Sequence, residues 1–208
     1  MKNILKTLLV TLILGVAYYV YHVHVDYRFE EISKDKVYKS ALIDPDKLPY
    51  YLEHHHIKTV IDLLDPGVQD ALNPAKQAHI DAEAKAVERY NKEHNASVLH
   101  VNIPSGQVPT KKTLTKFYEV LDNKNNYPVL IHCYHGTGRA QIYSAIYRIE
   151  YEGWKNEDAR AQTRFIVQAL GYRSSFADGK SKGDFLMHYK PRKFGEEATI
   201  FKLNESEK

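Results

Sequence analysis

The residue types best suited to chemistry lie in one short stretch, residues 129–140, which reads VLIHCYHGTGRA. An apolar, β-prone run ends at Cys133, and a loop with two glycines then leads to Arg139 at the start of a helical pattern. A strand, a loop and a helix in this order direct backbone N–H groups toward an anion. A thiolate at the base of such a loop, with a planar guanidinium at its rim, can bind a phosphate group and attack its phosphorus. The same N–H groups and the helix dipole favour the thiolate form of the cysteine.

Four residues of this stretch, His132, Cys133, Gly136 and Arg139, have the spacing His-Cys-x-x-Gly-x-x-Arg. This pattern resembles the signature of the protein tyrosine and dual-specificity phosphatases. A chance string in an ordinary βα turn is the alternative, but the strand, loop and helix context agrees with the motif. A rhodanese-like sulfur-transfer loop fits less well, because that loop is typically shorter between the cysteine and the closing basic residue.

The resemblance implies a cysteine phosphatase that transfers a phosphoryl group to Cys133 Sγ and then hydrolyses the cysteinyl-phosphate. It also implies that His132 supports the thiolate by hydrogen bonding and that Arg139 stabilises the transferring group. Thiolate and arginine take the place of metal ions in this chemistry, so we expect no metal ion and no other cofactor. The residues expected to bind the phosphate are Tyr134, His135, Gly136, Thr137, Gly138 and Arg139.

The sequence departs from the family's pattern at two positions. The family usually has Ser or Thr after the arginine, where it assists breakdown of the phosphoenzyme, and this chain has Ala140. Laying the family's general-acid loop over residues 104–109 puts Ser105 where the acidic Asp is expected. General acid catalysis is typically worth about 10²–10⁴-fold in rate. Three possibilities stay open: Asp178 or Asp184 supplies the proton, the substrate has a good leaving group, or the protein binds phosphate and turns over slowly.

Length and composition limit the classes of protein to consider. The 208 residues are enough for one globular domain of ordinary size plus a tail or an anchor. The formal net charge of +3 is mild and gives no indication of nucleic-acid binding. The chain has one cysteine, so no intramolecular disulfide and no cysteine-based zinc site can form. We expect a monomer whose partners are phosphorylated proteins or small phosphate-ester or lipid substrates.

Residues 1–25 are the most hydrophobic part of the chain, and no Asp, Glu, Lys or Arg occurs from residue 7 to residue 25. A helix of this length spans about 28 Å, close to the roughly 30 Å of a bilayer's hydrocarbon core. Lys2 and Lys6 precede the apolar run and keep the N-terminus in the cytoplasm by the positive-inside rule. We therefore expect a membrane anchor, with the catalytic domain outside the cytoplasm, which is the periplasm if the cell is Gram-negative.

A cleaved signal peptide is the main alternative for this segment. Gly15-Val16-Ala17 fits the small-x-small pattern of a cleavage site, and cleavage there would give an exported soluble protein. The retained anchor is favoured because the apolar run continues past Ala17. A buried core helix is the third possibility, and the basic amino end makes it the least favoured.

Strand-like and helix-like segments alternate from residue 37 to Cys133. This order predicts an α/β fold with a mostly parallel central sheet flanked by helices, like that of the dual-specificity phosphatases, after an N-terminal hydrophobic helix. Ligands bind beyond the carboxyl ends of such strands, which is where Cys133 falls. The predicted strands are residues 37–40, 59–64, 97–103 and 129–133. The predicted helices are residues 44–56 with Asp44 as cap, 75–94, 110–121 as a capped helix that starts at Thr110, 140–152, 156–170 with Asn156 as cap, and 184–189.

The expected domains are an anchor or signal segment at 1–25, a connector at 26–36, a cysteine phosphatase domain at 37–195 and a charged tail at 196–208. The expected function is hydrolysis of phosphate monoesters of the phosphotyrosine or dual-specificity type. One alternative is a catalytically weak phosphate-binding pseudophosphatase; another is a phosphoinositide or inositol phosphate phosphatase. Basic residues near the C-terminus favour the latter, although nearby acidic residues are typical of an ordinary solvated tail; the basic residues are Lys180, Lys182, Lys190, Arg192 and Lys193.

Overall fold

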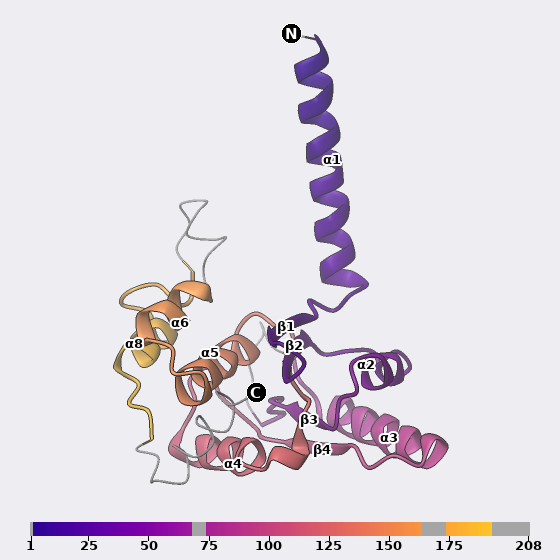
Figure 1. Ribbon diagram of the computed structural model, residues 1–208, viewed down its shortest axis with the longest axis vertical. Coiled ribbons are helices and arrows are strands. Elements are labelled where there is room, and N and C mark those ends of the chain that lie inside the picture. Colours follow the sequence, from indigo (N-terminus) through magenta and orange to yellow (C-terminus); the bar gives the residue numbers. More distant parts are fainter. Residues whose placement is uncertain (1, 68–73, 164–173, 193–208) are drawn as a thin grey trace, which may run out of the picture. The chain divides into compact units, whose positions relative to one another are not determined.

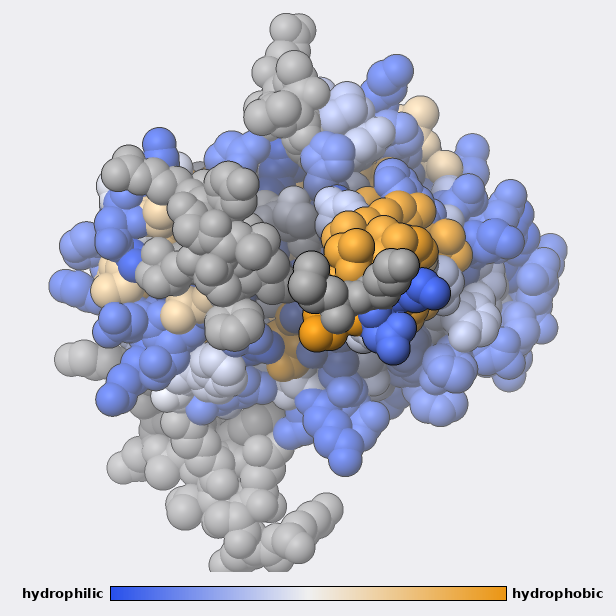
Figure 2. Space-filling model, turned by 90° about the horizontal axis from the view of Figure 1, so that it is seen from above, coloured by the Kyte–Doolittle hydropathy of each residue, from blue (hydrophilic) through white to orange (hydrophobic). Residues whose placement is uncertain are grey.

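The computed structural model describes residues 2–67, 74–163 and 174–192. The chain forms two compact units, Met1–Ser144 and Ala145–Lys208. Helix α1, Lys2–His24, comes first and is apolar and exposed over most of its length. In Figure 2 the largest hydrophobic surface belongs to α1, which is seen along its axis.

A five-stranded sheet forms the centre of the first unit (Figure 1). The strand order is β1-β2-β5-β3-β4, in which β1 runs antiparallel to β2 and all other neighbours are parallel. This confirms the predicted α/β fold with a mostly parallel sheet. All residues of β5 are buried, as expected for an apolar strand at the middle of a parallel sheet. The bounds are β1 Glu30–Ser33, β2 Val37–Ala41, β3 Thr59–Asp62, β4 Leu99–Asn102 and β5 Val129–Cys133.

Helices cover both faces of this sheet. Their bounds are α2 Leu48–His54, α3 Gln77–His94, α4 Lys111–Leu121 and α5 Arg139–Tyr151, with a 3-10 turn η1 at Lys124–Asn126. Helices α2 and α3 lie on one side, and α4 and the start of α5 lie on the other (Figure 1). Tyr38, Val60 and Leu130, from three adjacent strands, belong to the apolar cluster under α2 and α3. Burying one such side chain stabilises the fold by about 1.5–3 kcal/mol. On the other side Phe117 meets Tyr143 edge to face, with ring centroids 4.9 Å apart.

Two details of the first unit differ from the expectations. The predicted helix cap at Asp44 is wrong, because the Asp44 carboxylate accepts a hydrogen bond from the Asp46 N–H at 2.9 Å in a turn, and α2 begins only at Leu48. The predicted connector contains strand β1, which the sequence did not indicate. Only Ile32 of β1 is fully buried, so the strand carries a weak hydrophobic signal.

The second unit contains the end of α5, helix α6 (Asn156–Gln162) and helix α8 (Ser181–His188). The prediction that Asn156 caps α6 is wrong. Lys155 is the cap residue, and the Asn156 amide instead donates hydrogen bonds to the carbonyls of Leu186 and Tyr189 at 2.8 and 2.6 Å, which ties α6 to the end of α8. The rest of the helix predicted to reach residue 170 lies outside the described residues.

Candidate active site

Cys133 is the last residue of β5, at the carboxyl edge of the sheet and beside Ala41 of β2. Its side chain is buried, and the Ala140 N–H at the start of α5 donates to Sγ with an N···S distance of 3.5 Å. A sulfur atom at the N-terminal end of a helix lies in the positive field of the helix dipole and of the unpaired N–H groups there. The fold therefore surrounds Cys133 with groups that stabilise negative charge.

The Cys133–Arg139 loop depends on a glycine at its centre. Gly136 has φ +69°, in the left-handed region that side chains rarely adopt. A Cβ atom at this position would lie 2.6 Å from the Ala41 nitrogen and 2.8 Å from the Ser40 carbonyl carbon. The loop backbone packs directly on the end of β2, so only glycine fits here.

The carbonyl groups of the loop are held by partners outside it. The Leu42 N–H donates to the Tyr134 carbonyl at 3.3 Å, and the Arg28 guanidinium donates to the His135 carbonyl at 2.8 Å. In a planar trans peptide the C=O and the following N–H point in opposite directions. The N–H groups of His135 and Gly136 therefore point away from these partners, which is the arrangement that a backbone anion site requires.

Two cationic side chains contact the loop: Arg28, from the segment before the sheet, and Lys39, from β2. Arg28 follows α1 by four residues and has φ +52°, an uncommon backbone conformation for a residue other than glycine. Lys39 is buried in β2, where its Nζ lies 2.9 Å from a Glu30 carboxylate oxygen and 3.5 Å from the Gly136 carbonyl oxygen. Both side chains stabilise the outward orientation of the loop carbonyls.

Arg139, at the end of the loop, is buried and fixed by the neighbouring strand. Its Nη1 donates to the Leu63 carbonyl at 3.1 Å, just beyond the end of β3. The Ile142 N–H donates to the Gly138 carbonyl at 3.1 Å, so the helical hydrogen bonds start within the loop. A guanidinium held in this way is oriented before any ligand arrives, which suits planar recognition of phosphate oxygens.

Ser105, which the sequence places at the position of the family's acidic residue, is fully buried. Its hydroxyl lies 3.0 Å from the hydroxyl of Tyr143, one helical turn after Arg139. Burial raises the pKa of Tyr143, outweighing the hydrogen bonds and the Arg139 charge that lower it, so the phenol stays neutral at ordinary pH. The pair therefore joins the 104–109 loop to α5 as a neutral hydrogen bond.

The two other acid candidates lie in the second unit and have local partners there. Asp178 is paired with Arg160 of α6. Asp184 accepts a hydrogen bond from the Gly179 N–H at 3.0 Å, in the first turn of α8. Both contacts fit structural roles, and the role of either residue as a proton donor stays a prediction.

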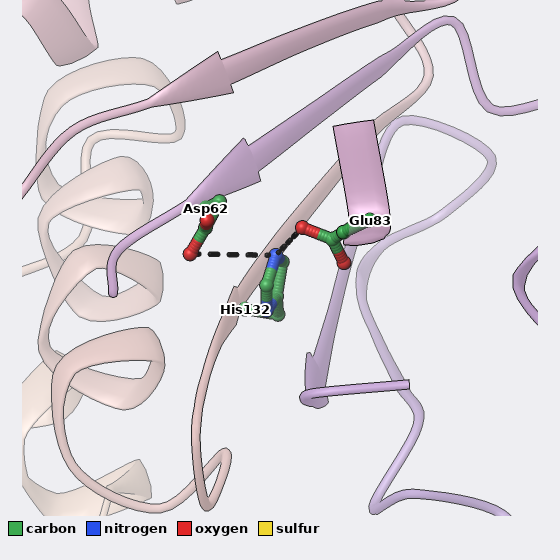
Figure 3. Close-up of side chains that lie close together, drawn as sticks. All are labelled: Asp62, Glu83 and His132. Atoms are coloured by element: carbon green, nitrogen blue, oxygen red, sulfur yellow. Dashed lines mark hydrogen bonds and ion pairs between the residues drawn. The ribbon is translucent and has the colours of Figure 1, made fainter. Parts of the chain in front are cut away.

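His132 lies one residue before the cysteine and belongs to a buried cluster on the α3 side of the sheet (Figure 3). Its Nε2 lies 2.9 Å from Glu83 Oε2, a carboxylate that α3 brings over the sheet. The same Nε2 is 3.8 Å from Asp62 Oδ1, on the neighbouring strand β3. His100 of β4 also contacts Glu83 Oε2, with its own Nε2 at 2.9 Å. One carboxylate oxygen of Glu83 therefore serves two histidines.

The charges in this cluster shift the pKa values of its members in opposite directions. Burial lowers the pKa of His132, but the Glu83 and Asp62 carboxylates and the neighbouring Cys133 outweigh it and raise that pKa to about 9. Burial raises the pKa of Glu83, but His132 and the hydrogen bonds from both histidines lower it to about 2. Burial is the main reason that the pKa of Asp62 is raised. At neutral pH the cluster contains a Glu83 carboxylate beside a His132 imidazolium.

The donor atoms of Asp62, Glu83 and His132 also have the types that bind metal ions, and they lie within 4.8 Å of one another. A hydrogen bond between His132 Nε2 and Glu83 Oε2 accounts for the 2.9 Å distance between these two atoms. All three residues are fully or nearly fully buried. The geometry is that of a buried hydrogen-bonded ion pair.

Sequence reasoning brought Cys133, the loop and Arg139 to one edge of the sheet, but it missed several of their neighbours. Glu83 could have been found, because it occupies a position in the apolar stripe formed by Ile80, Val87 and Tyr90 on one face of α3, where a carboxylate needs a buried partner. Arg28 gives no such signal. Its contact with the loop joins residues 107 positions apart in the sequence and depends on the tertiary fold.

Three cysteine-based phosphatases, Siw14, TpbA and PTPMT1, have solved structures with the same fold. The core catalytic domain of the PP-IP phosphatase Siw14 from S. cerevisiae matches with a TM-score of 0.54 and 18% identity, over 85% of this chain and 92% of that one. TpbA from P. aeruginosa matches with a TM-score of 0.54 and 18% identity, over 88% and 94%. PTPMT1 in complex with PI(5)P matches with a TM-score of 0.51 and 17% identity, over 83% and 97%. No curated protein matches this chain by sequence.

Family membership rests on a match to the sequence itself. The model of the tyrosine phosphatase family matches residues 25–162, well over half of the 208 residues. The matched range runs from the segment that carries Arg28 through the sheet and the Cys133–Arg139 loop to the end of α6. The chain therefore belongs to the tyrosine phosphatase family and is a cysteine-dependent phosphatase.

Proposed function

We propose that Cys133 is the nucleophile of this phosphatase and that the loop N–H groups and Arg139 bind the phosphate. The observation that carries this proposal is the Ala140 N–H directed at Sγ at the end of β5, beside a loop whose carbonyls are turned outward. In the first step an S–P bond forms, the bond from phosphorus to the leaving oxygen breaks, and the electron pair goes to that oxygen. In the second step water attacks phosphorus, the S–P bond breaks, and inorganic phosphate and the thiolate are released.

We propose aryl phosphates, phosphotyrosine in particular, as the substrates. With Ser105 buried against Tyr143, the position of the family's acid offers a neutral hydroxyl. A phenol with a pKa near 10 leaves without a proton far more readily than a serine alkoxide does. The family match to tyrosine phosphatases supports the same substrate class.

The alternative substrate class is inositol phosphates and phosphoinositides. It is supported by two structures with the same fold, the PP-IP phosphatase Siw14 and PTPMT1 in complex with PI(5)P. The basic residues that favour it are partly engaged elsewhere. The Lys182 ammonium lies 5.7 Å from the centre of the Phe176 ring. The Arg192 guanidinium pairs with Glu150 at 3.4 Å. These contacts within the second unit favour the aryl phosphate.

Phosphate release by the full chain in detergent, measured beside its Cys133→Ser variant, tests both proposals. The substrates are a series of aryl phosphates of rising leaving-group pKa, a phosphotyrosine peptide, a phosphoserine peptide and an inositol polyphosphate. We expect turnover that the variant lacks, and kcat/KM that falls steeply as the leaving-group pKa rises. Binding of phosphate analogues without turnover would contradict the proposed enzyme activity and support the pseudophosphatase alternative. A flat leaving-group dependence would show that an acid is supplied.

We also propose that α1 anchors the protein in a membrane, with the catalytic unit outside the cytoplasm. In support, α1 is long and apolar enough to cross a bilayer, and its described side chains are exposed from residue 3 to residue 21. Arg28 is the fourth residue after the end of α1 at His24, a chain length of at most about 14 Å. Arg28 contacts the Cys133–Arg139 loop directly, so the catalytic loop lies near the membrane surface.

Carbonate extraction of cell membranes and the mass of the purified protein test the anchor. We expect the uncleaved chain in the membrane pellet and protection of the catalytic unit from protease added on the cytoplasmic side. A soluble product shortened after Ala17 would establish the signal peptide instead.

A further inference from the structure

Glu83 has a place in the molecule that its phosphatase fold alone does not explain. A carboxylate on a helix that packs on a sheet is expected to face solvent, because burying a charge is costly unless it is paired. The Glu83 side chain is 1% exposed and aims at the ring of His132, the residue directly before the cysteine (Figure 3). Such a costly placement calls for a role beyond packing.

Among the residues that the structure describes, Glu83 is the hydrogen-bond partner of the His132 ring. Its Nε2 has Glu83 Oε2 at 2.9 Å, whereas Asp62 Oδ1 is at 3.8 Å, beyond ordinary hydrogen-bond distance. The Asp62 carboxylate has other donors, the Leu64 N–H at 2.7 Å and the Asn102 amide at 3.2 Å. The other ring nitrogen, Nδ1, is buried and has no hydrogen-bond partner among the described residues. Glu83 is therefore the group on which the orientation and charge of this ring depend.

Within residues 2–67, 74–163 and 174–192, the charged or titratable groups of this cluster come from four elements. Asp62 lies on β3, Glu83 on α3, His100 on β4 and Cys133 on β5 with the ring itself. In a dry interior, the negative charges of Asp62 and Glu83 would disfavour a thiolate at Cys133, unless a cation lies between the carboxylates and the sulfur. His132 is the ring in contact with Glu83 and next in sequence to the sulfur.

We propose that Glu83 is a positioning residue that holds His132 as an imidazolium behind Cys133 and thereby sets the pH range in which the thiolate exists. His100, which shares the same oxygen of Glu83, fixes the carboxylate in place. The raised pKa of His132 and the lowered pKa of Glu83 agree with this geometry. The consequence for catalysis rests on the proposed role of Cys133. The effect of Glu83 and His132 on the charge of the Cys133 thiol does not depend on that role.

The single cysteine of the chain makes the relation measurable without any substrate. The rate of alkylation by iodoacetamide, followed against pH on the full chain in detergent, reports the thiolate fraction at Cys133. In Glu83→Gln, which keeps the shape and loses the charge, we expect the midpoint of this curve to rise by about one pH unit. Below the midpoint, alkylation then slows about tenfold. The acid limb of kcat/KM should move by the same amount.

Glu88→Gln is the matched control, because Glu88 lies on the exposed face of the same helix. Its alkylation curve should coincide with that of the unmodified chain. Glu83→Asp keeps the charge and should recover part of the shift. A folded Glu83→Gln variant with an unchanged midpoint would overturn the proposal. A shifted alkylation curve without phosphatase activity would retain this proposal and remove the proposed function instead.

A second measurement covers the case in which Glu83→Gln does not fold. In the unmodified chain, the imidazole NMR signals of His132, identified by their loss in His132→Asn, should stay those of a doubly protonated ring at pH 8. Loss of the ring proton below pH 7 would contradict the proposal. So would one equivalent of a transition metal bound to the purified protein and lost in Glu83→Gln, because metal ligation would remove the proton from Nε2.

Discussion

At the scale of single residues, the Cys133–Arg139 loop combines the proposed nucleophile with backbone geometry that other residues enforce. Arg28, Lys39 and Leu42 hold its carbonyls from outside, and Leu63 holds the guanidinium of Arg139. Preorganisation of this kind matters because a displacement of about 1 Å in a catalytic group can cost on the order of 100-fold in rate.

Gly136 is the position where the loop tolerates no change. In Gly136→Ala the new Cβ would meet the Ala41 nitrogen at 2.6 Å, and φ +69° would be strained for alanine. We expect the loop to shift and kcat/KM on an aryl phosphate to fall on the order of 100-fold. The measurement is phosphate release together with calorimetric binding of a phosphate analogue.

Gly106→Ala is the control for that substitution, because the atom nearest to its new methyl group would be the Val108 carbonyl oxygen, 3.9 Å away. We expect it to leave kcat/KM unchanged within about twofold. Equal activity of the Gly136→Ala and Gly106→Ala variants would show that the close packing of the loop on β2 is not required for phosphate binding.

The sequence predicted the residues of the loop because their spacing carries the chemistry. It also pointed to the unusual positions of Ser105 and Ala140, but it gave no partner for Ser105. The hydrogen bond between Ser105 and Tyr143 depends on how α5 packs beside the 104–109 loop, a contact between residues 38 positions apart. Long-range contacts of this kind depend on tertiary packing, which residue spacing alone does not reveal.

At the scale of elements, the buried cluster joins α3 to three strands, and its ionisation should be visible in stability. The pKa of Glu83 is lowered from 4.5 to about 2, so its contribution is complete above pH 4.5 and is lost as pH falls toward 2. The pKa of His132 is raised from 6.5 to about 9, so its contribution is complete below pH 6.5 and is lost as pH rises toward 9. The two contributions overlap between pH 4.5 and 6.5.

We therefore expect the free energy of unfolding to decrease between pH 6.5 and 9 by up to about 3 kcal/mol through this pair. The measurement is chemical denaturation followed by circular dichroism at several pH values. Glu83→Gln should be less stable at pH 6 and should lack this decrease. If the variant and the unmodified chain show parallel curves from pH 6.5 to 9, His132 does not carry the charge that the cluster predicts.

Helix α4 offers a test of a local signal that sequence reasoning read correctly. The sequence predicts a capped helix that starts at Thr110, and the Thr110 Oγ1 accepts a hydrogen bond from the Thr113 N–H at 3.2 Å. Thr110→Ala removes the cap and should cost about 1 kcal/mol of stability. Thr115→Ala, within the same helix and exposed, should change stability by less than about 0.5 kcal/mol. Equal thermal midpoints of the two variants would count against the cap.

The elements that sequence reasoning found and those it misplaced differ in how local their signals are. The buried strands β3 and β5 stand out as apolar runs, and the α4 cap lies next to the helix it starts. Strand β1 is different, because it pairs at the sheet edge and buries only Ile32. Asp44 has the residue type of a helix cap, but its carboxylate accepts a hydrogen bond from the Asp46 N–H in a turn. The neighbouring residues Pro45 and Lys47 do not indicate that a turn forms here instead of a helix start.

At the scale of the whole molecule, the segment between α1 and β1 packs against the rest of the first unit. The Ala41 N–H donates to the Tyr27 carbonyl at 2.7 Å, and the Phe29 ring stacks on His55 with centroids 4.4 Å apart. With the Arg28 contact to the His135 carbonyl, these interactions connect the end of the proposed anchor to the Cys133–Arg139 loop. The family match, which begins at residue 25, includes the same segment.

Two truncations test this connection. A fragment that begins at Asp26 should be soluble without detergent and keep the kcat/KM of the full chain. A fragment that begins at Glu30 loses Tyr27, Arg28 and Phe29, and we expect a thermal midpoint several degrees lower and a kcat/KM reduced by more than about tenfold. Thermal unfolding by circular dichroism and phosphate release from an aryl phosphate give the two quantities.

The single substitution Arg28→Ala in the full chain separates loop positioning from the packing of the segment. Its guanidinium contacts the His135 carbonyl, while Tyr27 and Phe29 provide the aromatic contacts. We expect kcat/KM to fall while the thermal midpoint stays within about 2 °C, since a single exposed hydrogen bond contributes little to stability. If the Glu30 fragment matches the full chain in both quantities, the segment is only a tether, and the Cys133–Arg139 loop holds its shape without it.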